Sequence, residues 1–499
     1  MAKKVALIPV DARPVTYDLP KDLASLAGWE LLLPAKEKIG FLKTPADYDY
    51  LFQWVDEIAP QVDGVIVSID MILYGGLVPS RINTDDQSTI QDRLDRFLDI
   101  KRKYPQLDMM AFSSTMRLSN SYVNQEEKEY WDQYGKEIWQ YSYHYHRYQQ
   151  HGLKEDEAIV ESMKEKIPHA ILEDYLKTRE RNFTVNMSLI NYVADGVLDH
   201  LVFPQDDTSE YGLNIIEQQQ LRDRLFAKNL QENIFIYPGA DEVASVLVAH
   251  MIYQLENVTY PTFYPIYSGQ RGALAIALYE DRPLQESVKG QIDAFGSHTV
   301  ESIEDADIVL GINVPGRKQG DVSLRKQLSE IDTNDRNIGE WVKKLSYYYK
   351  KRKQVAIADV AYANGADPMM IPYVLQQFSL TELAGFAAWN TAGNTIGTVI
   401  AQAALVHLAN QQGHDFSKAK NKQLVLRLLD DYLYQTVVRQ EVREVMDEPS
   451  VTEGELLRKV EELFMTRAVE MVRKIDSNIQ LESIYLPWNR TFEIGITLK

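Results

Sequence analysis

The hydrophobic pattern of the chain consists of short runs rich in Val, Ile, Leu and Phe, separated by longer segments with helical spacing of apolar residues. Such runs are typical of strands that are buried on both faces of a parallel sheet. Strands that alternate with helices predict βαβ crossovers. We therefore expect an α/β fold with two doubly wound, mainly parallel sheets rather than one closed barrel. The predicted strands are residues 5–10, 30–33, 65–69, 109–112, 201–203, 234–237, 263–267, 308–312, 355–358 and 385–388.

A polar tract rich in aromatic residues breaks this alternation between the fourth and fifth predicted strands. It predicts a helical insertion of two or three helices at about residues 118–195. A second polar stretch near residues 229–233 separates an N-terminal α/β domain at 1–230 from a second α/β domain at 231–410. Residues 411–499 are expected to form a C-terminal helical region whose last segment returns to the cleft between the domains.

Composition narrows the possible classes of function. The 499 residues include 53 Lys and Arg against 72 Asp and Glu, which gives a formal net charge of −19, and no Cys. Excess negative charge disfavours nucleic acid and anionic membranes, and a chain without Cys has no disulfide, thiolate metal site or thiol nucleophile. The N-terminal apolar run is too short for a signal peptide, and the apolar stretch at 399–408 is too short to span a membrane. We expect a cytoplasmic protein without nucleic-acid or membrane partners.

Polar residues follow almost every predicted strand, at the sheet edge where parallel α/β proteins bind ligands. Glycoside hydrolysis uses two carboxyl groups, one that protonates the leaving oxygen and one that acts as base or nucleophile. In an extended segment adjacent side chains point to opposite faces, so we expect only one of the neighbours Asp206 and Asp207 to face the site. The candidates for this catalytic chemistry are Asp70, Asp206, Asp207, Asp241 and Asp359.

Arginines and amides at the same edge indicate a polar ligand with several hydrogen-bonding groups, held in one shared hollow between the domains. The alternative is local structure, because a strand-end Asp or Thr such as Asp241 or Thr391 often only caps the next helix. The residues predicted to bind substrate are Asp11, Arg13, Tyr74, Arg81, Arg117, Glu242, Asn364, Asp367, Trp389, Asn390, Asn394, Trp488, Asn489 and Arg490.

Cofactor motifs are missing from the sequence, which contains no G-x-G-x-x-G, Walker lysine, H-E-x-x-H or EF-hand pattern. The Gly-rich segment at 389–397 suits either a ligand loop or a tight turn with a Thr cap. We expect no cofactor and no dedicated metal site, although strand-end aspartates could bind Mg²⁺ or Mn²⁺.

With these residues in view, the chain resembles a large uncharacterised bacterial family that is catalogued as a domain of unknown function. The resemblance implies that the motifs belong together, and it supplies no activity. The matching pieces are Asp11-Ala12-Arg13-Pro14, Asp70 with Tyr74-Gly75-Gly76-Leu77 and Ser80-Arg81, Glu180-Arg181-Asn182, Gln205-Asp206-Asp207, Pro238-Gly239-Ala240-Asp241-Glu242, Asn364-Gly365 with Asp367, Trp389-Asn390-Thr391 with Asn394, and Pro487-Trp488-Asn489-Arg490.

Three hypotheses about function follow from the sequence. The first is a carbohydrate-active enzyme, a glycoside hydrolase that uses paired carboxylates on small saccharides in the cleft between the domains. The second is an isomerase or lyase of sugars or sugar acids that depends on a divalent metal. The third is a two-lobed protein that binds a small ligand without turnover. Each has a small polar partner, and self-association into a homo-oligomer is left open.

Overall fold

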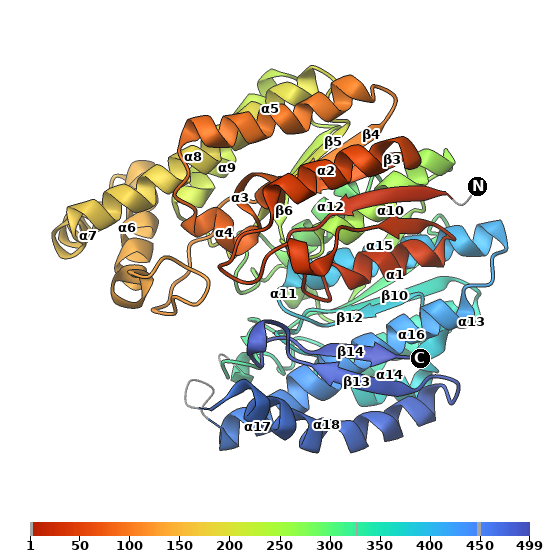
Figure 1. The fold of residues 1–499 in the computed structure, drawn as a ribbon. Coiled ribbons are helices and arrows are strands. Elements are labelled where there is room, and N and C mark those ends of the chain that lie inside the picture. The colour runs from red at the N-terminus through yellow and green to blue at the C-terminus, as the bar shows by residue number, and fades with distance from the viewer. Residues whose placement is uncertain (1–2, 326–327, 447–450) are drawn as a thin grey trace. The chain divides into compact units, whose positions relative to one another are not determined.

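The computed structural model describes residues 3–325, 328–446 and 451–499. The chain divides into two compact units (Figure 1). The first unit consists of residues 1–12, 31–244 and 279–281, and the second of residues 13–30, 245–278 and 282–499. Each unit is built around its own parallel sheet, so the expected α/β class with two mainly parallel sheets is confirmed.

The first sheet has six strands in the order β2-β1-β3-β4-β5-β6. The strand pairs from β1 to β6 are all parallel, and their apolar side chains are buried, as expected of strands covered on both faces. The strands are β1 (Lys4–Ile8), β2 (Glu30–Leu32), β3 (Gly64–Ser68), β4 (Asp108–Phe112), β5 (His200–Gln205) and β6 (Ile234–Pro238).

Helices of the first unit begin at capping residues that the sequence provides. Asp47 accepts a hydrogen bond from the Tyr50 N–H at the start of α2, and Asp86 does the same for Thr89 at the start of α5. The helices and short 3₁₀ turns between the strands are η1 (Lys36–Lys38), α2 (Tyr48–Ile58), η2 (Ala59–Gln61), α3 (Ile69–Tyr74), α4 (Leu77–Ile82), α5 (Gln87–Lys103) and α9 (Leu213–Ala227).

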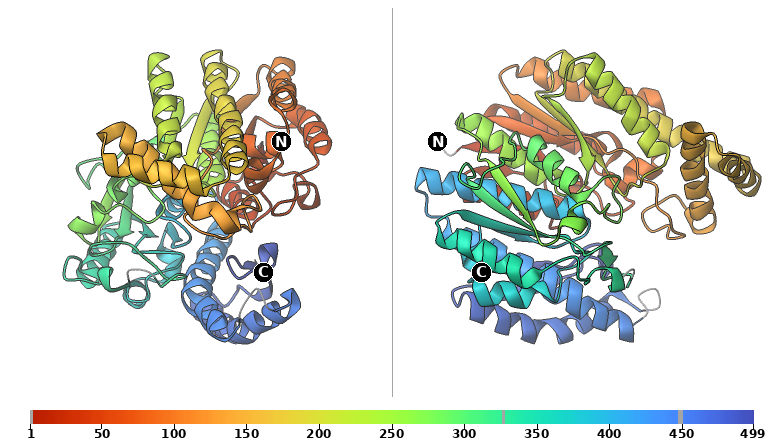
Figure 2. Two further views of the ribbon diagram at one scale, coloured as in Figure 1. Left: turned by 90° about the vertical axis from the view of Figure 1, so that its left-hand side faces the viewer. Right: turned by 180° about the vertical axis from the view of Figure 1, so that it is seen from behind.

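The predicted insertion before β5 consists of three helices, α6 (Trp131–His151), α7 (Lys154–Lys166) and α8 (His169–Ala194). The views in Figures 1 and 2 show α6 and α7 as a hairpin that projects beyond the sheet of the first unit. A separate core holds the insertion together, in which the ring of Trp131 lies 5.7 Å from that of Tyr175. The insertion is therefore a small packed body and not a loop.

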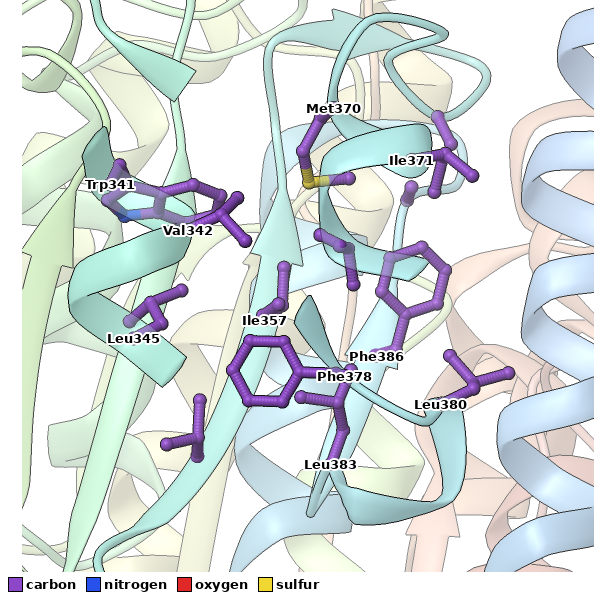
Figure 3. Close-up of a cluster of buried hydrophobic side chains, with 14 of the residues drawn as sticks. Trp341, Val342, Leu345, Ile357, Met370, Ile371, Phe378, Leu380, Leu383 and Phe386 are labelled. Atoms are coloured by element: carbon purple, nitrogen blue, oxygen red, sulfur yellow. The ribbon is translucent and has the colours of Figure 1, made fainter. Parts of the chain in front are cut away.

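The second sheet has the strand order β12-β10-β8-β7, with all pairs parallel. Helix α15 packs on β10, β8 and β12. A hydrophobic cluster that includes α13 and α14 covers the same sheet (Figure 3), and in it Trp341 and Leu345 meet Ile357, Phe378 and Phe386. The strands are β7 (Phe263–Tyr267), β8 (Ile308–Asn313), β10 (Gln354–Asp359) and β12 (Gly385–Ala387), and β9 (Gly320–Asp321) pairs with β11 (Tyr362–Ala363) beside them.

Helices connect the strands of the second unit, and one further helix lies in the chain between β6 of the first unit and β7 of the second. They are α1 (Asp18–Leu26), α10 (Val243–Glu256), α11 (Gln270–Ala273), α12 (Leu284–Ala294), η3 (Leu328–Glu330), α13 (Ile338–Lys350), α14 (Met370–Gln377), η4 (Leu380–Glu382) and α15 (Ala392–Gln412). Among the described residues, α15 alone is long and apolar enough to cross a membrane, and nearly all of it is buried inside the second unit. It is therefore a core helix, longer than the apolar stretch at 399–408 suggested.

The C-terminal part of the chain belongs to the second unit. Helix α16 continues into an eleven-residue π-helix, η5, and a hydrophobic core joins η5 to α18 and the final hairpin of β13 and β14. The elements are α16 (Ser417–Arg427), η5 (Leu428–Val438), α17 (Arg439–Val445), α18 (Glu453–Ile475), β13 (Leu481–Tyr485), η7 (Pro487–Asn489) and β14 (Gly495–Leu498).

Two boundaries differ from those expected from the sequence. The strand at 234–237 was assigned to the second domain, but β6 pairs in register with β5 and completes the first sheet. Residues 411–499 were expected as a separate region, but they belong to the second unit, and Leu424 and Leu428 join the core of its sheet. In both cases tertiary pairing overrides the polar stretches in the sequence.

Candidate functional site

A cluster of acidic and arginine side chains lies at the carboxyl ends of β3, β4 and β5 in the first unit. In doubly wound sheets, ligands bind at this edge beside the point where the strand order reverses. Here the order reverses between β1 and β3, and α3 begins directly after β3. The acid–arginine cluster, as we name it, consists of Asp70, Arg81, Arg117, Glu126, Glu127, Asp206 and Asp207.

Arg81, in the last turn of α4, links the segment after β5 to the loop before α6. Its guanidinium donates to the carboxylate of Asp206 and, over 3.2 Å, to Oε2 of Glu126. The Arg81 side chain is only 2% exposed, so these ion pairs are largely shielded from water. Hydrogen bonds between a guanidinium and a carboxylate are charge-assisted and therefore strong, so Arg81 fixes the positions of both carboxylates.

Arg117 follows β4 and extends the same network. Its Nε donates to Glu127 Oε1 over 2.7 Å, and its NH1 donates to Asp207 Oδ2 over 3.0 Å. Its NH2 lies 3.2 Å from Glu126 Oε2, the oxygen that also contacts Arg81. Two guanidinium groups therefore hold four carboxylates from two distant parts of the chain.

Both Asp206 and Asp207 face this cluster, which corrects the expectation that only one of them would. The expectation assumed an extended backbone, but Asp207 has φ of 36°, in the left-handed region. This turn brings the Asp206 carboxylate to Arg81 and that of Asp207 to Arg117. A left-handed conformation costs a residue other than glycine about 1–3 kcal/mol, and such strain is concentrated at functional sites.

Burial sets the protonation of two acids in the cluster. Burial raises the pKa of Asp70 to about 6, and the Ser114 N–H, which donates to Asp70 Oδ2 over 2.9 Å, opposes the shift. Burial and then repulsion from Asp206 raise the pKa of Asp207. The Asp207 side chain is 29% exposed and that of Asp206 is 12% exposed, so Asp207 is the more accessible of the pair.

The other predicted residues of the first unit surround this edge of the sheet. Asp11 follows β1, and Asp241 and Glu242 follow β6. The Glu242 carboxylate accepts a hydrogen bond from the Ala240 N–H over 3.0 Å and so closes the turn after β6. Tyr74 is buried in α3, where the guanidinium of an arginine of α8 lies 4.9 Å from its ring centroid.

The second unit has its own polar group at the carboxyl ends of β8 and β10. The carboxylate of Asp359 accepts from Asn313 Nδ2 over 2.9 Å and from the Asp367 N–H over 2.6 Å. Arg336 NH1 donates to Asp367 Oδ2 over 2.7 Å, and both of these side chains are 0% exposed. Burial and then the charge of Asp367 raise the pKa of Asp359. We name these four residues the buried aspartate network.

The π-helix η5 adds a further acidic pair to the second unit. Arg427 donates to Asp430 Oδ2 over 2.7 Å and to Asp431 Oδ1 over 3.0 Å. The Ala388 N–H donates to Asp431 Oδ2 over 2.7 Å, which ties η5 to the end of β12. Burial raises the pKa of both aspartates.

Residues 492–494, which follow the 3₁₀ turn η7, line a cavity of about 20 Å³ in the second unit. Arg13 NH1 lies 3.2 Å from Glu493 Oε1, and its guanidinium lies 4.6 Å from the ring centroid of Trp488. Arg490 NH2 donates to the same Glu493 oxygen over 3.1 Å, whereas the neighbouring Asn489 is exposed. A cavity of this size admits about one water-sized group.

The segment at 389–397 is a turn with a Thr cap. Thr391 is the N-cap of α15 and accepts from the Asn394 N–H over 3.5 Å. Asn364 and Asn390 both have left-handed backbones, and the Asn364 N–H donates to the Asn390 carbonyl over 2.8 Å. The Trp389 side chain is buried beside this turn. The four predicted residues Asn364, Trp389, Asn390 and Asn394 thus meet in one piece of local structure.

Sequence reasoning missed acids that lie within these groups. Glu126 and Glu127 were placed in the polar tract of the predicted helical insertion, and Asp430 and Asp431 in the predicted C-terminal helical region, with no role at a site. The local pattern does not mark either pair as buried, because acids between apolar residues are also typical of the exposed face of a helix. Nothing in the local sequence marks Arg336 as the partner of Asp367.

Among residues 3–325, 328–446 and 451–499, no group of three or more His, Cys, Asp or Glu side chains is placed to bind a metal ion. In the acid–arginine cluster the carboxylate oxygens are instead bound by guanidinium groups. The arrangement is suited to proton transfer between neighbouring carboxyl groups whose environments differ.

Comparison with known proteins identifies the family. A family model described as "Protein of unknown function (DUF4127)" matches residues 5–497, a span that covers nearly all of both units and includes all the acidic groups described above. The curated proteins contain no match to the sequence. The chain therefore belongs to the family DUF4127, whose members are proteins of unknown function.

Proposed function

We propose that the protein is a cytoplasmic glycoside hydrolase that cleaves small saccharides with the carboxyl groups of the acid–arginine cluster and needs no cofactor. The observation that carries the proposal is the pair Asp206 and Asp207, which are adjacent in sequence but held by different arginines. Glycosidic cleavage needs one carboxyl group in each protonation state, and this pair supplies two different environments.

Asp207 is suited to donate the proton to the leaving oxygen. Burial and the neighbouring Asp206 raise the pKa of Asp207, and its side chain remains accessible to a substrate. An acid whose pKa lies near the working pH donates its proton most efficiently. Asp206, which is paired with the buried Arg81, is suited to act as base or nucleophile at the sugar carbon.

Asp70 is buried in the same cluster and has a positioning role in the proposed mechanism. Its carboxyl group holds the Ser114 N–H at the end of β4, three residues before Arg117. Arg117 in turn holds Asp207. A shift of Asp70 would therefore move the proton donor through the loop between them.

The test is a panel of 4-nitrophenyl glycosides assayed with the purified full chain. We expect turnover of at least one member, and a loss of about 100- to 10,000-fold in kcat/KM for Asp206→Asn or Asp207→Asn. The anomeric configuration of the first product, followed by NMR with the wild type, distinguishes the two roles of Asp206. Retention identifies a nucleophile that forms a covalent glycosyl intermediate, and inversion identifies a base that acts on water.

Asp92→Asn is the matched control, since Asp92 is exposed on α5 outside the cluster. This variant should retain full activity. The proposal is wrong if no glycoside is turned over and calorimetry detects no saccharide binding, or if Asp206→Asn and Asp207→Asn are as active as Asp92→Asn.

A further inference from the structure

A groove of about 400 Å³ lies in the second unit and shares no residue with the acidic groups described above. Its walls come from the C-terminal end of α13, the starts of β10 and β12, and from α15 and α16. It therefore opens at the amino-terminal edge of the sheet, whereas Asp359 ends β10 at the opposite edge. Its volume falls in the range of sites for small molecules.

The groove is cationic in a protein whose net charge is −19. Arg352, Lys353 and Lys420 line it together with a single acid, Glu382. Glu382 is occupied by a capping interaction, in which its carboxylate accepts from the Ser379 N–H over 2.8 Å. The lining therefore carries an excess of two positive charges.

The two lysines are fixed in place by backbone carbonyl groups. Lys353 Nζ donates to the carbonyls of Glu304 and Ala306 over 3.0 and 2.7 Å, and Lys420 Nζ donates to that of Thr381 over 2.6 Å. An ammonium group has three donors, so each lysine keeps capacity for a further acceptor. Burial lowers the pKa of Lys420, and an anion in the groove would reverse this shift.

Arg352 occupies a backbone position that favours glycine. It follows the C-cap of α13 with φ of 65°, and the Arg352 and Lys353 N–H groups donate to the carbonyls of Tyr349 and Tyr348. These are the two hydrogen bonds of a Schellman motif, in which the left-handed residue is usually glycine. The arginine side chain is exposed at the groove, and its guanidinium makes no ion pair with the residues that the structure describes.

Stabilisation of helix ends does not account for all three cations. Positive charge near a helix C-terminus is favourable, and this explains lysines that bond to carbonyl groups. It does not explain an arginine held in a strained backbone conformation with its guanidinium directed to a groove. Backbone strain that no packing interaction explains is typical of ligand sites.

We propose that this groove binds a small molecule through a phosphate group, held by Arg352, Lys353 and Lys420. Apolar Leu383 and Val406 and the exposed amide of Asn410 line the rest of the groove and would contact the esterified part. The inference is independent of the proposed hydrolase activity, since it concerns other residues in the other unit.

The test is isothermal titration calorimetry of the full chain with phenyl phosphate and with inorganic phosphate at constant ionic strength. We expect one saturable site per chain. Tighter binding of phenyl phosphate identifies an ester as the ligand, and tighter binding of inorganic phosphate identifies the free ion; either result supports the proposal. Binding of neither probe overturns it.

Arg352→Gly separates a ligand role from a structural role. Glycine adopts the left-handed conformation without strain, so the melting temperature without ligand should stay equal or rise, while the Kd for the better probe should weaken at least tenfold. Lys344→Gln, which removes an exposed cation of α13 outside the groove, should bind as the wild type does. Equal affinity of Arg352→Gly and wild type contradicts the proposal.

Discussion

The pKa values and the partners of single acidic side chains depend on burial and on residues distant in sequence, and not only on a place after a strand. Asp70, Asp206 and Asp207 were all predicted as candidates from their places after strands, and the structure brings them into one cluster. The local sequence does not indicate that Asp207 is left-handed, and the arginine that holds its carboxylate in this conformation, Arg117, is ninety residues away. Partners at long range, such as Arg336 for Asp367, are invisible to local patterns for the same reason.

Asp70→Asn should change how stability depends on pH. The pKa of Asp70 is raised from 3.8 to about 6, so the fold favours the protonated carboxyl. Its contribution to the free energy of unfolding is fully present below about pH 3.8 and is lost as the pH rises through 6. Asparagine mimics the protonated form at every pH. Relative to wild type, the variant should therefore gain about 1–2 kcal/mol between pH 5 and pH 8.

Urea unfolding at the two pH values measures this gain. Asp92→Asn provides the control, because its exposed carboxylate should leave the difference from wild type unchanged between pH 5 and pH 8. A constant difference between Asp70→Asn and wild type at both values would show that Asp70 is ionised throughout.

Arg336→Met should destabilise the second unit strongly. The change leaves Asp367 buried without its cation, and breaking one partner of a fully buried pair costs about 3–5 kcal/mol. Arg102→Met breaks an exposed ion pair with Asp99, in which the Arg102 side chain is 74% exposed and the Asp99 side chain 64%. This change should lower the free energy of unfolding by less than about 1 kcal/mol. Chemical denaturation compares the two, and similar costs would mean that Arg336 is hydrated.

Elements were predicted well where their apolar runs are continuous. Every predicted strand is present, because a strand buried on both faces needs an unbroken apolar run. The π-helix η5 was not predicted, since its i→i+5 pattern arises from packing and leaves no period of its own in the sequence. In η5 the consecutive residues Asp430 and Asp431 both form ion pairs with Arg427, so this element contributes an acidic pair to the polar groups of the second unit.

Contact between α13 and β8 gives a prediction at this scale. A Cβ on Gly311 would lie 2.5 Å from Leu345 Cδ1 and 3.0 Å from Trp341 Cζ2. Gly311→Ala should therefore cost about 1–3 kcal/mol, and Leu345→Ala about 2–5 kcal/mol. The double variant should cost less than both together, because the new methyl group enters the space that Leu345 leaves.

Unfolding in urea provides the double-mutant cycle. Gly311→Ala combined with Leu424→Ala, in the same hydrophobic cluster but on α16, should show additive costs. Additivity for the Leu345 pair would mean that α13 shifts away from the sheet when Gly311 is replaced.

At the scale of the whole molecule, the chain passes from the first unit into the second and back more than once. Residues 13–30 belong to the second unit, although the chain on either side of them belongs to the first. Helix α1 packs on α15 and α16 with Leu19, Leu23 and Leu26 buried. Its Asp22 carboxylate accepts a hydrogen bond from a glutamine of α16. The sequence suggested consecutive domains because polarity shifts along the chain, whereas contacts at long range decide which unit a segment joins.

A fragment of residues 245–499 should therefore fail to fold by itself. It lacks α1, so an apolar face of α15 and α16 would be exposed to water. Residues 13–30 joined to its N-terminus by a flexible linker should restore a cooperative thermal transition in circular dichroism. The linked fragment with Leu23→Asp should not regain it, and a cooperative transition of the unlinked fragment would show that α1 is dispensable.

The early place of α1 in the chain also bears on how the protein is made. Helix α1 is synthesised before α15, the helix that it covers, which is completed roughly 390 residues later, an interval of about 20–80 s at ordinary rates of synthesis. During this time the leucines of α1 lack the helices that bury them in the folded protein, so the nascent chain exposes an apolar face at this helix. Chaperones that bind exposed apolar helices would have this interval in which to hold α1, and its shielding can be complete only after α15 and α16 have been made.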